Sequence, residues 1–189
     1  RVTTPEVLEI AKMVYAGKLN VDLLAALRAQ KVRAVGISGV DGELITARRR
    51  PLVEVTCDDG VCRQVDYGEV GDIVAVDPTL LGVLAEAGHV PVIASLAADA
   101  EGRLLNNNAD TVAEALARAL QARKLIFLTG APGLLRDEAD PASLIPFATP
   151  AELQALFATG AVHAGMRPKV EACLRAGQGG VQRTHITDG

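Results

Sequence analysis

The sequence is poor in aromatic residues and has no excess of positive charge. Aromatic side chains make up 3% of its 189 residues, and tryptophan is absent. The core therefore has to be built from Leu, Val, Ile and Ala, and the stacking platforms that bind RNA or single-stranded DNA are missing. The formal net charge at pH 7 is -4, so no overall basic field attracts nucleic acid. We expect no nucleic-acid partner.

Long apolar runs and metal-binding patterns are also missing. No run reaches the roughly 18 residues that a membrane span needs, and no charged-then-apolar leader precedes the first predicted helix. The Cys57/Cys62 pair would suit a metal or a disulfide, but ordinary strand positions in a reducing compartment are the favoured interpretation, and Cys173 is left over. No HExxH, CxxC or acidic pair suggests a metal cage. We expect a cytoplasmic protein with no membrane contact and no resident metal ion.

The composition is that of a folded domain. Hydrophobic residues make up 49% and charged residues 22% of the chain, close to the globular average. A chain of this size buries roughly 70% of its unfolded surface and folds without a disulfide or metal. The chain starts at Arg1, just ahead of a capped helix, and ends at Gly189 directly after a strand-like run. We therefore expect it to be part of a longer protein.

Helix signals recur along the chain. Thr4, Pro5 and Glu6 predict the start of a helix that Gly17 ends, and Asn20 is expected to cap a second helix. Further helices are predicted over residues 78–88, 109–122, 149–157 and 166–176, of which the third starts with a Thr-Pro-Ala-Glu capping box.

Apolar strand-like runs alternate with these helices. Strands are predicted over residues 33–38, 72–76, 89–95, 124–129 and 181–187, and two runs around Asp-Asp-Gly at 58–60 predict a β-hairpin. The arginines at 48–50 just before it suit either phosphate contact or, as we favour, a solvated strand edge. The alternation predicts an α/β fold: a three-layer αβα sandwich with a mostly parallel central sheet, plus a β-hairpin insertion.

Two loops after predicted strands are candidate ligand sites, because open parallel sheets bind ligands there. Residues Asn106–Asp110 place three amides and a carboxylate at a helix start. One helix cap needs fewer polar groups, so we favour ligand binding over capping alone. Residues Thr129–Gly133 follow the most apolar strand, and their glycines suit either a plain turn or a phosphate or adenosine contact.

A third loop leads from His163 to Lys169, which lies in the first turn of a helix. A cation there opposes the helix dipole, so Lys169 is either a surface lysine or a phosphate-binding one. A fourth, glycine-rich loop over Val35–Gly42 is predicted to be a structural turn. Lysine, aspartate, amides and glycine loops without an evident nucleophile or base favour phosphoryl transfer to an acceptor that is already an anion.

These motifs resemble the amino acid kinase family, and within it the branch that phosphorylates N-acetylglutamate. The matching stretches follow the family order from end to end, and it is this ordered set that is specific. They are residues 1–3, 16–20, 34–42, 65–71, 91–95, 106–110, 124–129, 165–170 and 185–189.

The resemblance implies ATP-dependent phosphorylation of the side-chain carboxylate of N-acetyl-L-glutamate, a step of arginine biosynthesis, by a homodimer with Mg²⁺ arriving on ATP. It implies that Arg1 binds the substrate's α-carboxylate, and that Asn106 and Asn108 hold the acetylglutamate. It further implies that Lys169 stabilises charge on the transferring phosphoryl group and that Asp110 orients the lysines around it. The nucleotide would lie along four residues, Thr129, Gly130, Pro132 and Gly133.

The resemblance also predicts two lobes, an acceptor lobe over residues 1–96 and a nucleotide lobe over residues 97–189. The family usually has Asp at the position of Gly130, and its members begin earlier, with a lysine and a Gly-Gly loop. Two alternatives stay open. A kinase of carrier-linked aminoadipate in lysine biosynthesis would use a basic surface such as residues 48–50, and a non-catalytic homologue or fragment would be compatible with Gly130. The Asn-x-Asn-Ala-Asp pattern favours free acetylglutamate.

Overall fold

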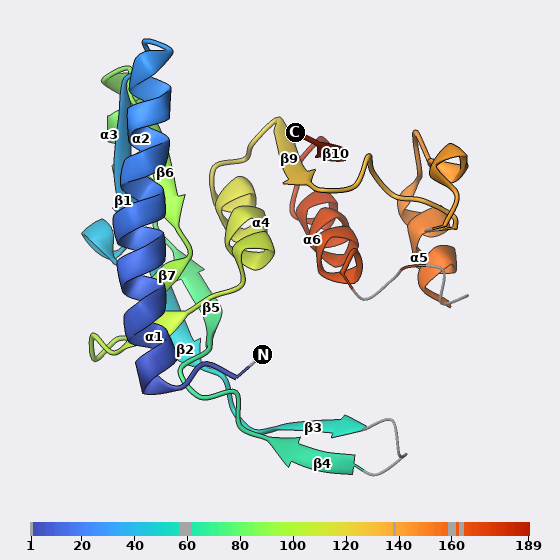
Figure 1. Ribbon diagram of the computed structural model, residues 1–189, viewed down its shortest axis with the longest axis horizontal. Helices are drawn as coiled ribbons and strands as arrows, with labels where there is room; N and C mark the ends of the chain where they lie inside the picture. The colour runs from blue at the N-terminus through green and yellow to red at the C-terminus, as the bar shows by residue number, and fades with distance from the viewer. Residues whose placement is uncertain (1, 57–61, 138, 159–161, 163–164) are drawn as a thin grey trace. The chain divides into compact units, whose positions relative to one another are not determined.

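The computed structural model describes residues 2–56, 62–137, 139–158, 162 and 165–189 (Figure 1). The chain divides into two compact units, Arg1–Ala109 and Asp110–Gly189, and each is described by itself. This boundary falls later in the chain than residue 96, where the predicted acceptor lobe ends. The reason is that β7 (Leu96–Ala98) pairs with both β8 (Leu104–Asn106) and the first unit's β2 (Ile45–Arg49).

One long helix opens the first unit. It runs without a break through α1 (Pro5–Ala11), the π-helical segment η1 (Lys12–Leu19) and α2 (Asn20–Ala29). Its predicted start is confirmed, since Thr4 Oγ1 accepts a hydrogen bond from the Val7 N–H at 3.3 Å.

The prediction that Gly17 ends this helix and that Asn20 caps a second one is wrong. Asn20 has helical backbone angles, φ -61° and ψ -50°. A helical glycine costs only about 1 kcal/mol, which is too little to end a helix that buries Leu8, Ala11 and Asn20. The π-helical turns at this point are a geometry that recurs near functional sites.

The remaining elements of the first unit form three sheets. β1 (Ala34–Ser38) and β6 (Val90–Ala94) pair in parallel, with Ala34 opposite Val90. A four-stranded sheet has the order β5-β2-β7-β8, in which β2 pairs antiparallel with β5 (Gly71–Val76) and parallel with β7. The helix α3 (Thr79–Glu86) connects β5 to β6, and the short helix η2 (Asp41–Glu43) precedes β2.

The third sheet is the pair β3 (Val53–Thr56) and β4 (Cys62–Val65), which lie antiparallel with Val53 opposite Val65. Residues 57–61, which connect them and include Cys57, lie outside the described residues, and the insertion of a hairpin into the fold stays a prediction. The arginines before β3 were expected at a solvated strand edge, and two of them are placed differently. Arg49 belongs to β2, which lies between β5 and β7, and it is paired with Asp66, whereas Arg50 is paired with Asp72.

The second unit places helices beside one parallel pair of strands. Its elements are α4 (Ala109–Ala119), β9 (Lys124–Thr129), η3 (Pro141–Ser143), α5 (Pro150–Ala158), α6 (Arg167–Gln178) and β10 (Arg183–Asp188). β9 and β10 run parallel, with Lys124 opposite Arg183. The predicted capping box is confirmed, since the Thr149 N–H donates to Glu152 Oε2 at 2.7 Å and the Glu152 N–H donates to Thr149 Oγ1 at 3.3 Å.

The larger core cluster of this unit consists of aliphatic and small side chains together with Phe127. Its members are Ala117, Leu125, Phe127, Ala172, Cys173, Ala176 and Val181. β9 alternates between buried Leu125 and Phe127 and the exposed side chains of Ile126 and Leu128, so one of its faces is covered within the described residues. The predicted α/β class with parallel strand pairs is confirmed. Within the described part of the chain, no helix combines the length and apolar character of a membrane span.

Candidate active site

Lys169 and Asp110 form an ion pair at the starts of two helices. Lys169 Nζ lies 3.0 Å from Asp110 Oδ2 and 3.2 Å from Oδ1, and the two side chains are 21% and 17% exposed. Asp110 lies in the first turn of α4, where the helix dipole favours a carboxylate, whereas Lys169 lies in the first turn of α6, where the dipole disfavours a cation. The carboxylate of Asp110 therefore offsets an unfavourable lysine. The structure brings these two predicted site residues together.

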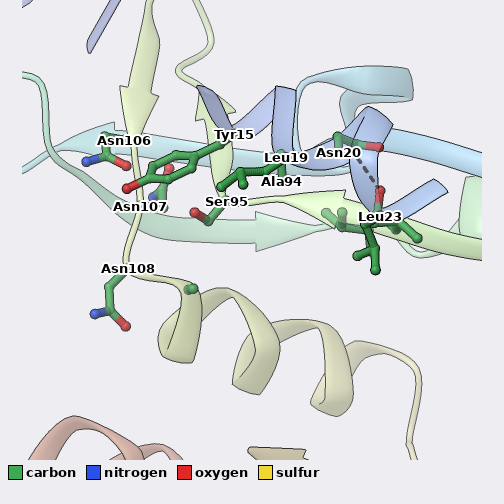
Figure 2. Close-up of a pocket in the computed structure, with 12 residues that line it drawn as sticks. Tyr15, Leu19, Asn20, Leu23, Ala94, Ser95, Asn106, Asn107 and Asn108 are labelled. Atoms are coloured by element: carbon green, nitrogen blue, oxygen red, sulfur yellow. Dashed lines mark hydrogen bonds between the residues drawn. The ribbon is translucent and has the colours of Figure 1, made fainter. Parts of the chain in front are cut away.

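A cavity of about 500 Å³ lies in the first unit, beside the predicted asparagines. The stretch Asn106–Ala109 and the end of β6 line one part of it, and the long helix contributes Tyr15, Leu19 and Leu23, spaced four residues apart on one face. Figure 2 shows the Tyr15 side chain extending toward Asn106 and Asn107. The cavity therefore combines amide groups with an aromatic and an aliphatic wall.

The three asparagines of the loop at the cavity, Asn106, Asn107 and Asn108, differ in their partners. Asn106 Nδ2 donates to Thr3 Oγ1 at 3.2 Å. Asn107 is 4% exposed, and its Nδ2 donates to the Gly71 carbonyl at 2.9 Å. Because Asn107 is buried and bonded to the backbone, its contribution is to hold the loop, while Asn108 lines the cavity beside it.

Asn20 is a cavity residue that sequence reasoning interpreted only as a helix cap. It is 7% exposed, and its Nδ2 donates to the carbonyls of Ile37 and Val92 at 3.4 and 3.5 Å, so it joins β1 and β6 to the helix. A Cβ at Gly36 would overlap Asn20 Oδ1, so the glycine is what makes room for this amide. Its signal in the sequence is a polar residue in the middle of an apolar helix face, which the interpretation as a cap did not use.

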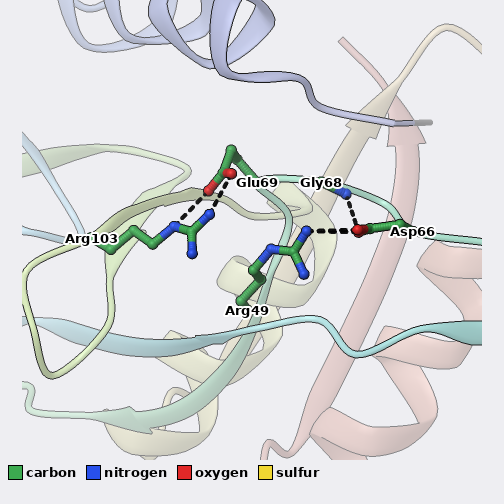
Figure 3. Close-up of polar contacts among 5 residues, drawn as sticks. All are labelled: Arg49, Asp66, Gly68, Glu69 and Arg103. Atoms are coloured by element: carbon green, nitrogen blue, oxygen red, sulfur yellow. Dashed lines mark hydrogen bonds and ion pairs between the residues drawn. The ribbon is translucent and has the colours of Figure 1, made fainter.

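A polar network holds the loop that supports Asn106 (Figure 3). Arg103 binds Glu69 through both Nε and Nη2, at 2.8 and 2.5 Å, and Arg49 Nη2 binds the two carboxylate oxygens of Asp66 at 2.8 and 2.9 Å. The hydrogen bond from Arg49 and a second one from the Gly68 N–H hold the pKa of Asp66 below its usual value. The Glu69 carbonyl in turn accepts a hydrogen bond from the Asn106 N–H at 2.8 Å.

The predicted nucleotide loop starts where β9 ends, at Thr129. Gly133 has φ 150°, and a Cβ there would lie 2.9 Å from Leu144 Cδ1 and 3.2 Å from the Ile186 carbonyl oxygen, so packing requires glycine. At Gly130, by contrast, a Cβ would meet nothing within 4 Å. No steric reason therefore explains the glycine at the position where the family usually has Asp.

Two residues of the predicted site loops, Arg1 and His163, lie outside the described residues. In the described part of the chain, no group of three or more His, Cys, Asp or Glu side chains is arranged to hold a metal ion.

Parallel strand pairs, helices that start on a lysine–aspartate pair and polar loops at strand ends define an α/β protein with charged and amide groups at helix starts. The model of the amino acid kinase family matches residues 1–188, and the chain belongs to that family. It is 50% identical over 192 residues to the acetylglutamate kinase of Myxococcus xanthus, covering 100% of this chain and 62% of that protein. It is 43% identical over 189 residues to the acetylglutamate kinase of Methanothrix thermoacetophila, covering 100% of this chain and 64% of that protein. The chain thus spans less than two thirds of these relatives.

Two solved structures have folds similar to this chain along its whole length. The smu.665 protein of Streptococcus mutans has a TM-score of 0.84 and 27% identity, with 100% of this chain and 71% of that chain covered. N-acetylglutamate synthase from Neisseria gonorrhoeae, in complex with coenzyme A and N-acetyl-glutamate, has a TM-score of 0.80 and 26% identity, with 100% and 40% covered.

Proposed function

We propose that this protein is an ATP-dependent kinase that phosphorylates the side-chain carboxylate of N-acetyl-L-glutamate. The observation that carries the proposal is the 50% identity to an acetylglutamate kinase along the whole of this chain. The ion pair between Lys169 and Asp110 and the asparagine-lined cavity support it.

The first unit is the proposed acceptor lobe. Acetylglutamate carries two carboxylates and an amide, and amide side chains can both donate to and accept from such groups. We assign Asn106 and Asn108, which line the cavity, to binding the acetylglutamate, and Arg1 to a bidentate contact with its α-carboxylate. The network of Glu69 and Arg103 supports this site by fixing the backbone of Asn106.

The second unit is the proposed nucleotide lobe. Lys169 stabilises the negative charge that develops on the transferred phosphoryl group, and Asp110 holds the ammonium group in place. The acceptor carboxylate is already an anion, so no side chain has to remove a proton from it. ATP supplies the phosphoryl group when bound, and we assign Thr129, Gly130, Pro132 and Gly133 to contact with it. Mg²⁺ would arrive bound to the phosphates of ATP.

We further propose a homodimer formed through the long helix. The apolar stripe of the long helix consists of Val7, Ile10 and Val21, which are 44%, 56% and 61% exposed. Gly17 lies between them along the helix and leaves open space, since a Cβ there would meet nothing within 4 Å. Exposed apolar side chains around a glycine suit close approach of an identical helix.

The test is a hydroxamate assay with ATP and acetylglutamate on this chain and on the full reading frame that contains it. Trapped acyl phosphate is expected from the full-length product. A second candidate, a protein that binds acetylglutamate without turnover, is favoured by the similarity to the N-acetylglutamate synthase structure. Binding by calorimetry together with no hydroxamate from the full-length product would establish the second candidate and refute the kinase.

A further inference from the structure

A buried carboxylate lies one helical turn beyond Asp110. Glu114 is 3% exposed, and within the described residues it is the only acidic side chain that is buried. It accepts hydrogen bonds from two arginines. Arg118, on its own helix, donates from Nη1 at 3.1 Å, and Arg175, on α6, donates from Nε at 3.2 Å. A carboxylate at this depth is stable only with such partners.

The two helices meet along matching faces. Asp110, Ala113, Glu114 and Ala117 recur on α4 at the spacing of one helix face, as do Lys169, Ala172, Cys173 and Ala176 on α6. Ala172 and Ala176 are fully buried, and with Ala117 of α4 they belong to one core cluster of mostly small side chains. Small side chains present shallow ridges, so the charged pairs add to the packing in setting how far one helix can slide along the other.

Two ion pairs therefore connect α4 to α6. Asp110–Lys169 lies at the start of both helices, and Glu114–Arg175 lies one turn further along α4 and nearly two turns further along α6. The rise of a helix is about 1.5 Å per residue, so a slide of α6 by one residue would displace the Lys169 backbone by half of the 3.0 Å that separates Nζ from Asp110 Oδ2.

We infer that Glu114 is a positioning residue for Lys169. By holding Arg175, Glu114 fixes the register of α6 against α4 and keeps the Lys169 ammonium group on Asp110. The kinetic consequence rests on the proposed function, because Lys169 is there the stabiliser of the phosphoryl group. A misplacement of about 1 Å in such a group costs up to about a hundredfold in rate.

Arg175→Gln and Arg118→Gln are a matched pair of variants that test this inference. Each removes one arginine from Glu114, but only Arg175 comes from the other helix. We expect Arg175→Gln to lower kcat about tenfold with the KM for acetylglutamate unchanged, and Arg175→Lys to restore most of it. Arg118→Gln is expected to keep the kcat of the wild type while lowering the melting temperature as much as Arg175→Gln does. Equal kcat losses in the two glutamine variants would overturn the inference, because they would indicate general destabilisation.

A second measurement does not depend on activity. Acylation of Lys169 by acetic anhydride, quantified by mass spectrometry against the exposed Lys124, reports how firmly the ammonium group is held. We expect Arg175→Gln to raise the labelling of Lys169 several-fold and Arg118→Gln to leave it unchanged. Unchanged labelling in Arg175→Gln would overturn the inference. A wild-type full-length protein without kinase activity would refute the proposed function, whereas the labelling would still decide the role of Glu114.

Discussion

Lys169 Nζ lies within hydrogen-bond distance of both carboxylate oxygens of Asp110, at 3.0 and 3.2 Å. The two residues are 59 positions apart in the sequence, and each comes from the first turn of its helix. A lysine in a first turn is disfavoured by the helix dipole, so the protein keeps a cation at a place where an isolated helix would not. This is the arrangement expected where a negative charge has to be stabilised.

Replacing Lys169 with alanine is expected to lower kcat by about 10²-fold or more, because a fixed cation on the phosphoryl group is lost. The KM for acetylglutamate should change little. Arg167→Ala is the control, since Arg167 is 64% exposed in the same turn and pairs with Glu171, and its kcat should remain that of the wild type. An unchanged rate in Lys169→Ala, measured in the hydroxamate assay, would remove Lys169 from the mechanism.

Asn106→Ala and Asn107→Ala are expected to separate binding from stability. Asn106 is assigned to the substrate, so its loss should raise the KM for acetylglutamate about tenfold, the effect of roughly 1.4 kcal/mol of lost hydrogen bonding. Asn107 is buried and donates to Gly71. Its loss should lower the free energy of unfolding by about 1–3 kcal/mol. Steady-state kinetics and urea denaturation of both variants check this, and the same KM effect in both would argue against the assignment of Asn106.

Gly36→Ala is expected to destabilise the fold by about 1–3 kcal/mol, since the added methyl group would overlap the Asn20 amide. Gly82→Ala is the matched control. A Cβ at Gly82 meets nothing within 4 Å, and the residue lies inside the helix α3, so this change should stabilise by about 0.5–1 kcal/mol. Chemical denaturation measures both, and the idea fails if the two substitutions shift stability in the same direction.

The capping contact of Glu152 makes the stability of the fold depend on pH in the acidic range. Hydrogen bonds from the Thr149 backbone N–H and hydroxyl hold the pKa of this carboxyl below its usual value of about 4.5. A lowered pKa in the folded state means that the stabilisation is present above about pH 4.5 and is lost as the pH falls below it. The melting-temperature difference between the wild type and Glu152→Gln should thus be constant near pH 7 and shrink below pH 4.5. A difference that does not vary with pH would contradict this origin.

Ile10→Glu is expected to dissociate the proposed homodimer, because a charge would be placed in the apolar stripe of the long helix. Val83→Glu is the control, since Val83 is 58% exposed on α3, outside the stripe, and Ile10 is 56% exposed. Sedimentation velocity at micromolar concentration should show a monomer for Ile10→Glu and a dimer for the wild type and Val83→Glu. A wild-type monomer would refute the homodimer.

Much of the secondary structure could be predicted because its signals are local. The Thr4 side chain accepts from an N–H only three residues ahead in its helix. Thr149 and Glu152 form a capping box across the same spacing. The apolar run at β9 predicted a strand, although its alternating burial depends on what packs against each face. The wrong prediction at Gly17 and Asn20 also came from local signals, because both residue types are common at helix ends. Only the packing around them shows that the helix continues.

The sequence by itself determined most helix starts, the strands of the two parallel pairs and, through the ordered motifs, the family, but it did not predict β2, β7 and β8. Only the tertiary structure decided which polar residues are structural. Asn20, Asn107 and Glu114 are bonded to partners 17, 36 and 61 positions away in the sequence. The periodicity of a helix or a strand predicts no contact at such separations. A buried polar group is stable only where those distant partners meet it, so its role is defined by the packed fold, whereas a cap or a turn is defined by its neighbours along the chain.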